Sequence, residues 1–309
     1  MPAPADGRHM RAEVTSGLVV VDKPAGMTSH DVVGRFRRIA GTRKVGHAGT
    51  LDPMATGVLV LGVERATKLL GHLTLTSKTY LATVRLGYAT VTDDAEGDRL
   101  DDGTADASDV TLDSVRAGIG GLTGQIEQVP SAVSAVKVAG RRAYERVRSG
   151  EEVELAARRV TVSRFDLLAD RRPEPGLLDL DVIVDCSSGT YVRALARDLG
   201  RALGTGGHLT ALRRTRVGPF TDALGLETLA KRAEAGEDPV TLGLDAAVEA
   251  SFPRRDVDGE TARVLGHGGR LTAIGVPGPY GVFGPDGRVI ALVSERDGQA
   301  RPEVVLRPG

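Results

Sequence analysis

The chain has 309 residues, of which 41% are hydrophobic and 26% are charged, and its formal net charge is −1 at pH 7. This composition predicts a sizeable core, in one large domain with a small one or in two of moderate size, and excludes wholesale disorder. Its one cysteine excludes an internal disulfide framework and a cysteine-based zinc site. No apolar run approaches the roughly 20 residues that cross a bilayer, so we expect a protein of the cytoplasm.

The N-terminal segment predicts a tail, a strand and a helix. Residues 1–14 are polar and contain prolines and a glycine, so we expect a disordered tail without the apolar segment of a secretory signal. The run GLVVVD at 17–22 predicts a short buried strand. The apolar residues of HDVVGRFRRIAG at 30–41 recur at helical spacing and predict a helix, with Ser29 as its N-cap and Gly41 as its stop.

The middle of the chain predicts a sheet with several helices. The run that begins at 57 predicts a strand followed by a helix around 66–73, and KTYLATVRLGYAT at 78–90 predicts a strand of an antiparallel sheet. The acidic stretch 92–109 predicts an exposed loop. Further helices are predicted at 112–119, 141–149 and 192–204, and further strands at 158–170 and 177–192.

The C-terminal part predicts a small β-rich unit. The run SFPRRDVDG at 251–259 predicts a linker, and RVIALVSERDG at 288–298 predicts a hairpin-like pair of short strands. Strands outnumber the patterns typical of parallel crossovers, so the predicted fold class is α+β. We expect a mixed sheet domain over 15–250 and a small domain over 251–309.

Charge is segregated along the chain although its sum is close to zero. Basic residues gather in three stretches at 35–44, 137–148 and 193–216, and acidic residues gather at 93–109. Such segregation can give a neutral protein a basic face that suits phosphate contacts. Helix faces that simply stay in water would give the same pattern.

A loop with one carboxylate, KVGHAGTLDPMATGVLVLG at 44–62, is the first candidate for chemistry. Its glycines let the backbone fold tightly and let a ligand approach, and Pro53 stiffens the position after Asp52. This pattern fits a held nucleophile or base. Asp-Pro is also a common turn opener, so the residues alone leave a plain turn as the alternative.

Metal and triad chemistry receive less support. The side chains of His30, Asp31, His47, Asp52 and His72 lack the i, i+4 histidine pair and the cysteine pairing of strong metal motifs. A triad of Ser29 with His47 and Asp52 lacks a GxSxG elbow, and no Walker or dinucleotide fingerprint is present. We therefore predict no metal site and no organic cofactor.

Six separated blocks resemble the bacterial tRNA pseudouridine synthase B family and occur in that family's order. They are GLVVVDKPAGMTSHDVV, RKVGHAGTLDPMATGVLVLGVERATK, KTYLATVRLG, PSAVSAVKVAGRRAYERVRSG, CSSGTYVRALARDLG and LTALRRTRVGPF, and they span 17–220. The resemblance implies the pseudouridine synthase fold, with a central mixed, largely antiparallel sheet flanked by helices. It also implies isomerisation of the T-loop uridine at position 55 of tRNA to pseudouridine. The implied partner is tRNA through its T-arm, with no membrane and no protein partner.

The resemblance also implies roles for single residues in catalysis. Asp52 falls at the family's one essential aspartate, which either attacks covalently or acts as a base on the ribose. Tyr80 matches the aromatic that packs against the flipped base, and Arg193 matches the arginine that pairs with the aspartate. A core tyrosine and a surface arginine are the plainer alternatives for the last two.

Further residues match substrate contacts or supports of the family's site. His47 matches the histidine that approaches the RNA where the flipped nucleotide departs, and Tyr191 is expected on the same face as Arg193. Leu212 matches an apolar wall of the pocket, although an ordinary core leucine would look the same. Phosphate contacts are expected from Arg213, Arg214 and Lys68. Lys23 and Pro24 match a pair that supports the active-site loop, and Asp94 matches a later family aspartate.

Two parts of the chain depart from the family pattern. Val91 stands where the family often has an acid, which puts one peripheral polar contact in doubt. The segment after residue 252 matches weakly, but its position and RVLGHGGRL suggest the small PUA-like RNA-binding domain that often ends this family.

Three other functions compete with the stand-alone enzyme. The catalytic subunit of a guide-RNA ribonucleoprotein shares the DKP, TSH and GTLDP motifs. A non-catalytic tRNA-binding or RNA-folding protein would need the same basic residues but no reactive carboxylate. A hydrolase would release free uracil from tRNA.

Overall fold

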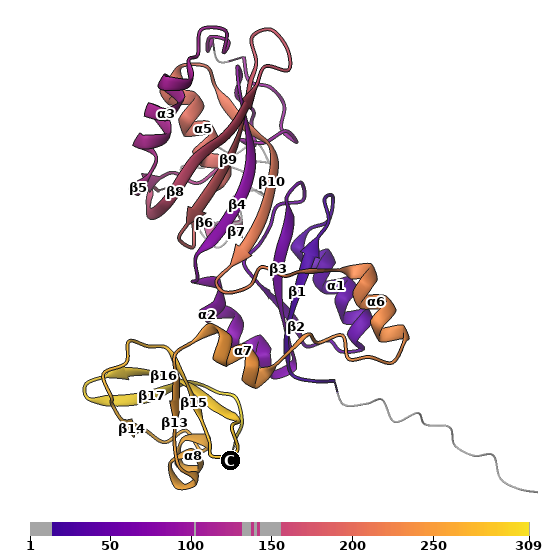
Figure 1. Ribbon diagram of the computed structural model, residues 1–309, viewed down its shortest axis with the longest axis vertical. Coiled ribbons are helices and arrows are strands. Elements are labelled where there is room, and N and C mark those ends of the chain that lie inside the picture. The colour runs from indigo at the N-terminus through magenta and orange to yellow at the C-terminus, as the bar shows by residue number, and fades with distance from the viewer. Residues whose placement is uncertain (1–13, 102, 132–136, 139–140, 143–155, 309) are drawn as a thin grey trace, which may run out of the picture.

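Two sheets organise the part of the chain that the structure describes. A computed structural model describes residues 14–101, 103–131, 137–138, 141–142 and 156–308. The larger is a ten-stranded sheet, and a five-stranded sheet lies in the C-terminal part (Figure 1). None of the helices in these ranges is long and apolar enough to cross a membrane.

The N-terminal half of the large sheet is built around two antiparallel strands, β1 and β3. Their outer partners are short strands from other parts of the chain, and α1 packs against α6 beside them (Figure 1). The elements are β1 (Gly17–Lys23), β2 (Val45–Ala48), β3 (Thr56–Val63), β11 (Leu224–Gly225), β12 (Leu242–Gly243), α1 (Ser29–Ala40), a 3₁₀ helix (Glu64–Leu69), α2 (Leu70–Thr74), α6 (Leu226–Glu234) and α7 (Leu244–Ser251).

The other half of the large sheet is antiparallel throughout, in the order β10-β4-β9-β8-β5. Helices α3 and α5 cover one of its faces (Figure 1). The elements are β4 (Lys78–Leu86), β5 (Gly124–Gln128), β8 (Arg158–Arg171), β9 (Leu178–Cys186), β10 (Gly207–Val217), α3 (Leu112–Gly121) and α5 (Val192–Leu203), with a separate two-stranded pair of β6 (Lys137–Val138) and β7 (Arg141–Arg142).

A parallel pair joins the two halves at the centre of the sheet. Strand β3 lies beside β10, with Thr56 opposite Arg213 and Gly57 opposite Arg214. Most other neighbours in the sheet are antiparallel, so the predicted α+β class with a mixed, largely antiparallel sheet is confirmed. The loop that ends in β3 and the arginines of β10 therefore meet at this seam.

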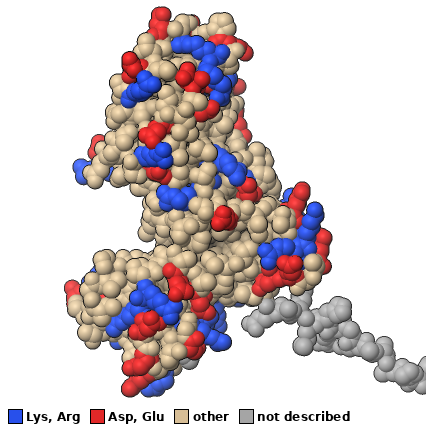
Figure 2. Space-filling view, in the orientation of Figure 1, with Lys and Arg blue, Asp and Glu red and all other residues tan. Residues whose placement is uncertain are grey.

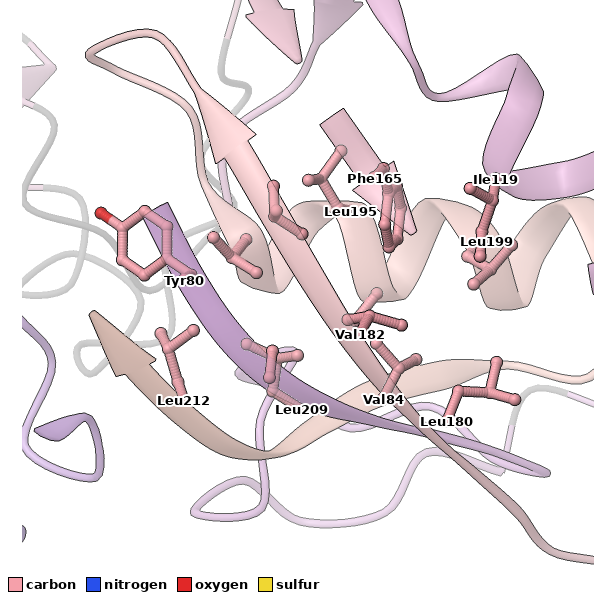
Figure 3. Packing of buried hydrophobic residues seen from close by; sticks show 14 of the residues in the cluster. Tyr80, Val84, Ile119, Phe165, Leu180, Val182, Leu195, Leu199, Leu209 and Leu212 are labelled. Atoms are coloured by element: carbon pink, nitrogen blue, oxygen red, sulfur yellow. The ribbon is translucent and has the colours of Figure 1, made fainter. Parts of the chain in front are cut away.

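The larger apolar cluster lies between the covered face of the sheet and α3 and α5. Ile119 of α3 and Leu195 and Leu199 of α5 are fully or almost fully buried against the sheet. Figure 3 shows Tyr80 and Leu212 at one end of this cluster, with the Tyr80 hydroxyl pointing away from the other side chains. The core thus ends in an aromatic ring with a polar tip.

The small sheet has the order β13-β15-β16-β17-β14 and its own apolar cluster. Its elements are β13 (Arg254–Asp256), α8 (Gly259–Gly266), β14 (Leu271–Thr272), β15 (Tyr280–Phe283), β16 (Val289–Arg296) and β17 (Gln299–Val305). Helices α2 and α7 lie between it and the large sheet (Figure 1). A second cluster combines residues of both sheets, among them Leu18 of β1 and Phe283 of β15, and it includes Leu306 just after β17.

The start of α1 differs from the prediction by one residue. Thr28, not Ser29, is the N-cap, because its backbone is extended while its hydroxyl accepts the amide of Asp31 at 3.1 Å. The Asp31 carboxylate in turn accepts the Thr28 amide at 2.9 Å, which completes a capping box. Gly41 ends the helix in the left-handed conformation, as predicted.

Two C-terminal predictions are wrong. The segment predicted as a linker contains β13, which pairs in parallel with β15, and so belongs to the small sheet. The run 289–296 is one strand rather than a pair, because the turn comes later, at Asp297 and Gly298, where both residues have positive φ. The hairpin is therefore formed by β16 and β17.

A predicted helix and the predicted tail fall largely outside the described ranges. Residues 141–142 are a strand rather than the start of a helix, and 143–149 lie outside the described residues. The predicted tail at 1–14 also lies outside them, except for residue 14.

Candidate active site

Hydrogen bonds from the end of β1 and the start of α1 hold the loop that carries Asp52. The ammonium group of Lys23, which is fully buried, donates to the carbonyls of Pro24 at 2.9 Å, Met27 at 2.6 Å and Pro53 at 3.1 Å. Ser29 adds a second clamp, since its hydroxyl accepts the Leu51 amide at 2.9 Å. The backbone on both sides of Asp52 is thereby held in place.

Asp52 is both a turn residue and an acid at the surface of a cavity. Its carbonyl accepts the Ala55 amide at 3.1 Å, which closes the turn that an Asp-Pro pair predicts. Its side chain is 36% exposed, so the carboxylate is reachable from solvent.

The Asp52 carboxylate forms a two-point ion pair with Arg193 of α5. Nη2 of Arg193 donates to Oδ1 at 3.2 Å, and Nε lies 3.0 Å from Oδ2. The guanidinium is 5% exposed, whereas the carboxylate is much more open. A planar fork on a carboxylate fixes its direction as well as its position. The structure therefore brings together the acid and the arginine that the family resemblance paired.

Arg193 is held from its other side by the acidic loop. Its Nη1 donates to the carbonyl of Thr92 at 2.8 Å and lies 3.3 Å from Oδ2 of Asp94, which is 3% exposed. The prediction that the acidic stretch is an exposed loop is wrong for Asp93 and Asp94, because both are buried against α5 and pair with arginines.

A cavity of about 280 Å³ opens beside the Asp52–Arg193 pair. Tyr80 forms part of its wall with 8% of the residue exposed, and burial raises the pKa of its phenol while Arg214 acts in the opposite direction. Leu212 lies next to the ring. The lining also includes Gly49, Thr50, Leu51, Lys78, Ser187, Tyr191 and Arg214.

The two consecutive arginines of β10 differ in role, and one differs from its prediction. Arg214 is 1% exposed and donates to the carbonyls of Val58 at 2.8 Å and Gly49 at 3.0 Å, so it supports the loop from inside and is not an exposed phosphate contact. A side chain at Gly57 would place its Cβ 2.1 Å from the carbonyl oxygen of Arg214, which only glycine avoids. Arg213 forms a two-point pair with Asp22 at 2.9 and 3.0 Å and keeps 47% of its side chain exposed.

Three predicted contact residues lie around the cavity or apart from it. Tyr191 lines the cavity and is the N-cap residue of α5, and its amide donates to Gln128 at 2.8 Å. His47 is half-buried in β2, where burial lowers its pKa, and its ring meets His30 edge-on at 5.3 Å. Lys68 lies away from the cavity lining and donates to the Val305 carbonyl of β17 at 3.0 Å.

Several residues of the site have no sequence motif that predicts their role. Lys78 lines the cavity and caps the end of α2 through the carbonyls of Thr74 and Thr76, and burial lowers its pKa to about 8. The buried Asp93 pairs with Arg197, which is partly buried and lies one turn further along α5 than Arg193. The helical spacing of the two arginines on α5 is the one signal that could have linked them.

Within the described ranges, no group of three or more His, Cys, Asp and Glu side chains is placed to hold a metal ion. The single cysteine, Cys186, is buried behind the cavity, and burial raises the pKa of its thiol to about 11. In the view of Figure 2, basic and acidic side chains are interspersed over the molecule. A broad basic face is therefore not seen from this side.

The fold and family models define the class of protein. The solved Cbf5–Nop10–Gar1 complex matches with a TM-score of 0.71 at 26% identity, over 94% of this chain and 85% of that chain. The archaeal box H/ACA sRNP Nop10–Cbf5 complex matches with 0.70 at 26% identity, over 98% and 90%. A model of the TruB family pseudouridylate synthase N-terminal domain matches residues 37–192. Models of two C-terminal domains match 193–249, from tRNA pseudouridylate synthase B, and 252–307, from tRNA pseudouridine synthase II. The class is that of the pseudouridine synthases, which are isomerases.

Curated relatives narrow the class to one family. A tRNA pseudouridine synthase B of Nocardia farcinica is 60% identical over 96% of this chain and 95% of its own length. The protein of the same name from Rhodococcus jostii is 59% identical over 96% of this chain and 95% of its own length. The chain belongs to the TruB family of pseudouridine synthases.

Proposed function

We propose that this protein isomerises the T-loop uridine at position 55 of tRNA to pseudouridine, with Asp52 as the reacting carboxylate. The observation that carries the proposal is the Asp52 carboxylate, fixed by Arg193 at the mouth of a cavity walled by Tyr80 and Leu212. Family membership and the names of the relatives support the reaction and the substrate class.

The reaction needs few parts beyond these side chains. The bond between N1 of uracil and C1′ of the ribose breaks, the base turns, and C5 forms the new bond to C1′. C5 gives up its proton and N1 gains one, so atoms balance without a co-reactant. A carboxylate can begin this sequence as a nucleophile at the sugar or the ring, or as a base on the ribose.

The cavity fits a base that has left its stack. A uridine inside a folded T-arm has to be flipped out before a carboxylate can reach it, and the flipped base then needs stacking and edge contacts. Tyr80 offers a ring face and Leu212 an apolar wall, at the end of a cluster that otherwise excludes water. Tyr191, the N-cap residue of α5, and Arg193, two positions later, both line this cavity.

The remaining parts of the proposal concern tRNA and the small sheet. We assign residues 15–250 to a catalytic domain and 251–309 to a PUA-like domain that contacts RNA, with support from the C-terminal family match. Exposed guanidinium groups such as that of Arg213 suit phosphate contacts with the T-arm. The cytoplasm, where tRNA is modified, is the proposed location.

The test is to map pseudouridine in an unmodified tRNA transcript after incubation with the pure protein. We expect one site, at the T-loop uridine, without any guide RNA. Conversion that requires a guide RNA would favour a catalytic subunit of a guide-RNA ribonucleoprotein. The structural similarity to Cbf5 is the reason for testing this alternative. Binding without conversion would favour a non-catalytic protein, and release of free uracil would favour a hydrolase.

A further inference from the structure

Helix α5 presents two arginines one turn apart to two consecutive acids of the loop at 90–96. Arg193 Nη1 lies 3.3 Å from Asp94 Oδ2, and Arg197 Nη1 lies 3.3 Å from Asp93 Oδ2. Residues four apart lie on one side of a helix, so the two pairs are stacked along α5. The first pair belongs to the site described above. The second lies behind it and does not line the cavity.

Asp93 is held in an unusual conformation with its side chain buried. Its φ is +60°, in the left-handed region that residues other than glycine seldom adopt, and its residue exposure is 7%. Its carbonyl accepts the Leu209 amide of β10 at 3.0 Å. Burial raises the pKa of the Asp93 carboxyl, and the charges of Arg197 and Arg193 act in the opposite direction. A strained residue of this kind persists only where surrounding contacts hold it.

Arg197 is the contact that holds Asp93 from the side of the helix. Its Nη2 donates to the Val129 carbonyl at 2.7 Å, just after β5, and its Nε donates to Asp198 Oδ1 at 2.9 Å. The guanidinium side chain is only 16% exposed. The Arg197 side chain therefore contacts three segments: the loop at 90–96 through Asp93, the residue after β5 through the Val129 carbonyl, and its own helix through Asp198.

The loop clamped in this way supplies both supports of Arg193 on the side away from Asp52. The Thr92 carbonyl precedes Asp93 in the chain, and Asp94 follows it. A shift of the backbone at Asp93 would move both supports together. Arg193 fixes the direction of the Asp52 carboxylate. A shift of the loop would therefore change the orientation of this carboxylate, although the loop residues themselves do not contact the substrate.

We propose that the Asp93–Arg197 pair is a positioning device for the reaction, which locks the loop at 90–96 so that Arg193 holds Asp52 in its reactive orientation. The proposal rests on the proposed function of the cavity. Neither residue is a catalytic residue, because neither lines the cavity.

The experiment compares six variants with the wild-type full-length protein on an unmodified tRNA transcript. Arg197→Gln and Asp93→Asn each remove one charge, and their combination removes both. Asp93→Gly removes the carboxylate but favours a positive φ, so it separates loss of the ion pair from backbone strain. Arg201→Gln is the matched control, since Arg201 is exposed one further turn along the same helix. The readouts are the single-turnover rate of pseudouridine formation, the Kd for tRNA and the unfolding temperature.

We expect each single change to lower the single-turnover rate roughly 10- to 100-fold, because small displacements of a reacting group have effects of this size. The Kd should change less than about threefold, since phosphate contacts dominate affinity. The double variant should be no slower than the slower single variant, because the two side chains act as one unit. Arg197→Lys should recover part of the rate, and Arg201→Gln should keep all of it.

Three outcomes would overturn the proposal. Wild-type rates in the folded Asp93→Gly and Arg197→Gln variants would show that the pair does not position the site. Multiplicative losses in the double variant would show that the two residues act separately. A loss confined to tRNA affinity would make them binding residues. Failure of the wild-type protein to form pseudouridine would instead refute the proposed function.

Discussion

At the scale of single residues, the site is a row of charged side chains that pair with one another, and only one of them is open to solvent. The exposed member is Asp52, whose carboxylate is more accessible to solvent than the groups that hold it. Arg193, Asp94 and Lys23 are almost wholly buried, and each makes contacts on more than one side. Buried charges remain favourable only with such partners. The flexibility of the reacting group is thus removed by residues that do not react.

Lys78 gives a residue-scale prediction about pH. Burial lowers its pKa to about 8 from an ordinary value of 10.5. Between these pH values the unfolded chain keeps the proton that the folded protein has released, so the free energy of unfolding rises with pH. From pH 7 to pH 9 we expect the wild-type protein to gain about 1 kcal/mol relative to Lys78→Met. Urea unfolding of both proteins at each pH measures this, and parallel pH dependences would contradict it.

The sequence predicted the site best where a motif could be matched. Asp52, Tyr80 and Arg193 lie together as the family resemblance required, although nothing in the residues alone placed α5 beside the loop. The expectation for Arg214 failed for a physical reason. Two adjacent arginines on a strand point to opposite faces, so one remains at the surface while the other enters the site.

At the scale of elements, two neighbouring residues at the start of α1 have different roles, one in the stability of the helix and the other in holding the active-site loop. Thr28 and Ser29 are neighbours, but Thr28 caps the helix and Ser29 binds Leu51 of the loop. The predicted cap was wrong because both residues suit a cap, and only the backbone angles decide between them. Alanine substitutions at Thr28 and Ser29 can therefore test the two roles separately.

We expect Thr28→Ala to lower the free energy of unfolding by about 1 kcal/mol, the usual value of an N-cap, with little change in the single-turnover rate. Ser29→Ala should lower the rate, because the Leu51 amide next to Asp52 loses its partner. Urea unfolding and single-turnover assays on the two variants check this. Equal effects of both changes on the rate would contradict the division of roles.

Elements with strong periodicity were predicted well, and segments shaped by distant contacts were not. The apolar spacing of α5 and the alternation of β4 and β9 are local signals. The burial of Asp93 depends on Arg197, more than a hundred positions later, and no local pattern contains that contact. The turn at Asp297 and Gly298 was misplaced because the strand before it is longer than its apolar run suggested.

At the scale of the whole molecule, the small sheet shares part of its core with the large one. Leu306 and Phe283 belong to the same apolar cluster as Leu18 of β1, and Arg65 donates to the Leu306 carbonyl at 3.0 Å. Lys68 makes a similar contact with Val305. The sequence suggested a small appended unit, but shared packing of this kind cannot be read from the order of strands.

This shared core predicts coupled stability. Leu306→Ala should cost about 2–5 kcal/mol and weaken the protection of β1 amides in native-state hydrogen exchange, because both sheets lose packing. Leu265→Ala is the matched control, since Leu265 of α8 is equally buried but lies in the cluster formed by the small sheet and the segments around it. We expect it to leave β1 protection unchanged. Unchanged β1 protection in Leu306→Ala as well would show that the sheets are stabilised independently.

The central claim concerns one carboxylate, and its most direct test is the single-turnover formation of pseudouridine by Asp52→Asn on unmodified tRNA. Asparagine keeps the shape of the side chain but cannot act as nucleophile or base. We predict a rate loss of more than about 1,000-fold, with tRNA affinity and unfolding temperature close to those of the wild-type protein. Pseudouridine formation by Asp52→Asn at the wild-type rate would contradict the account.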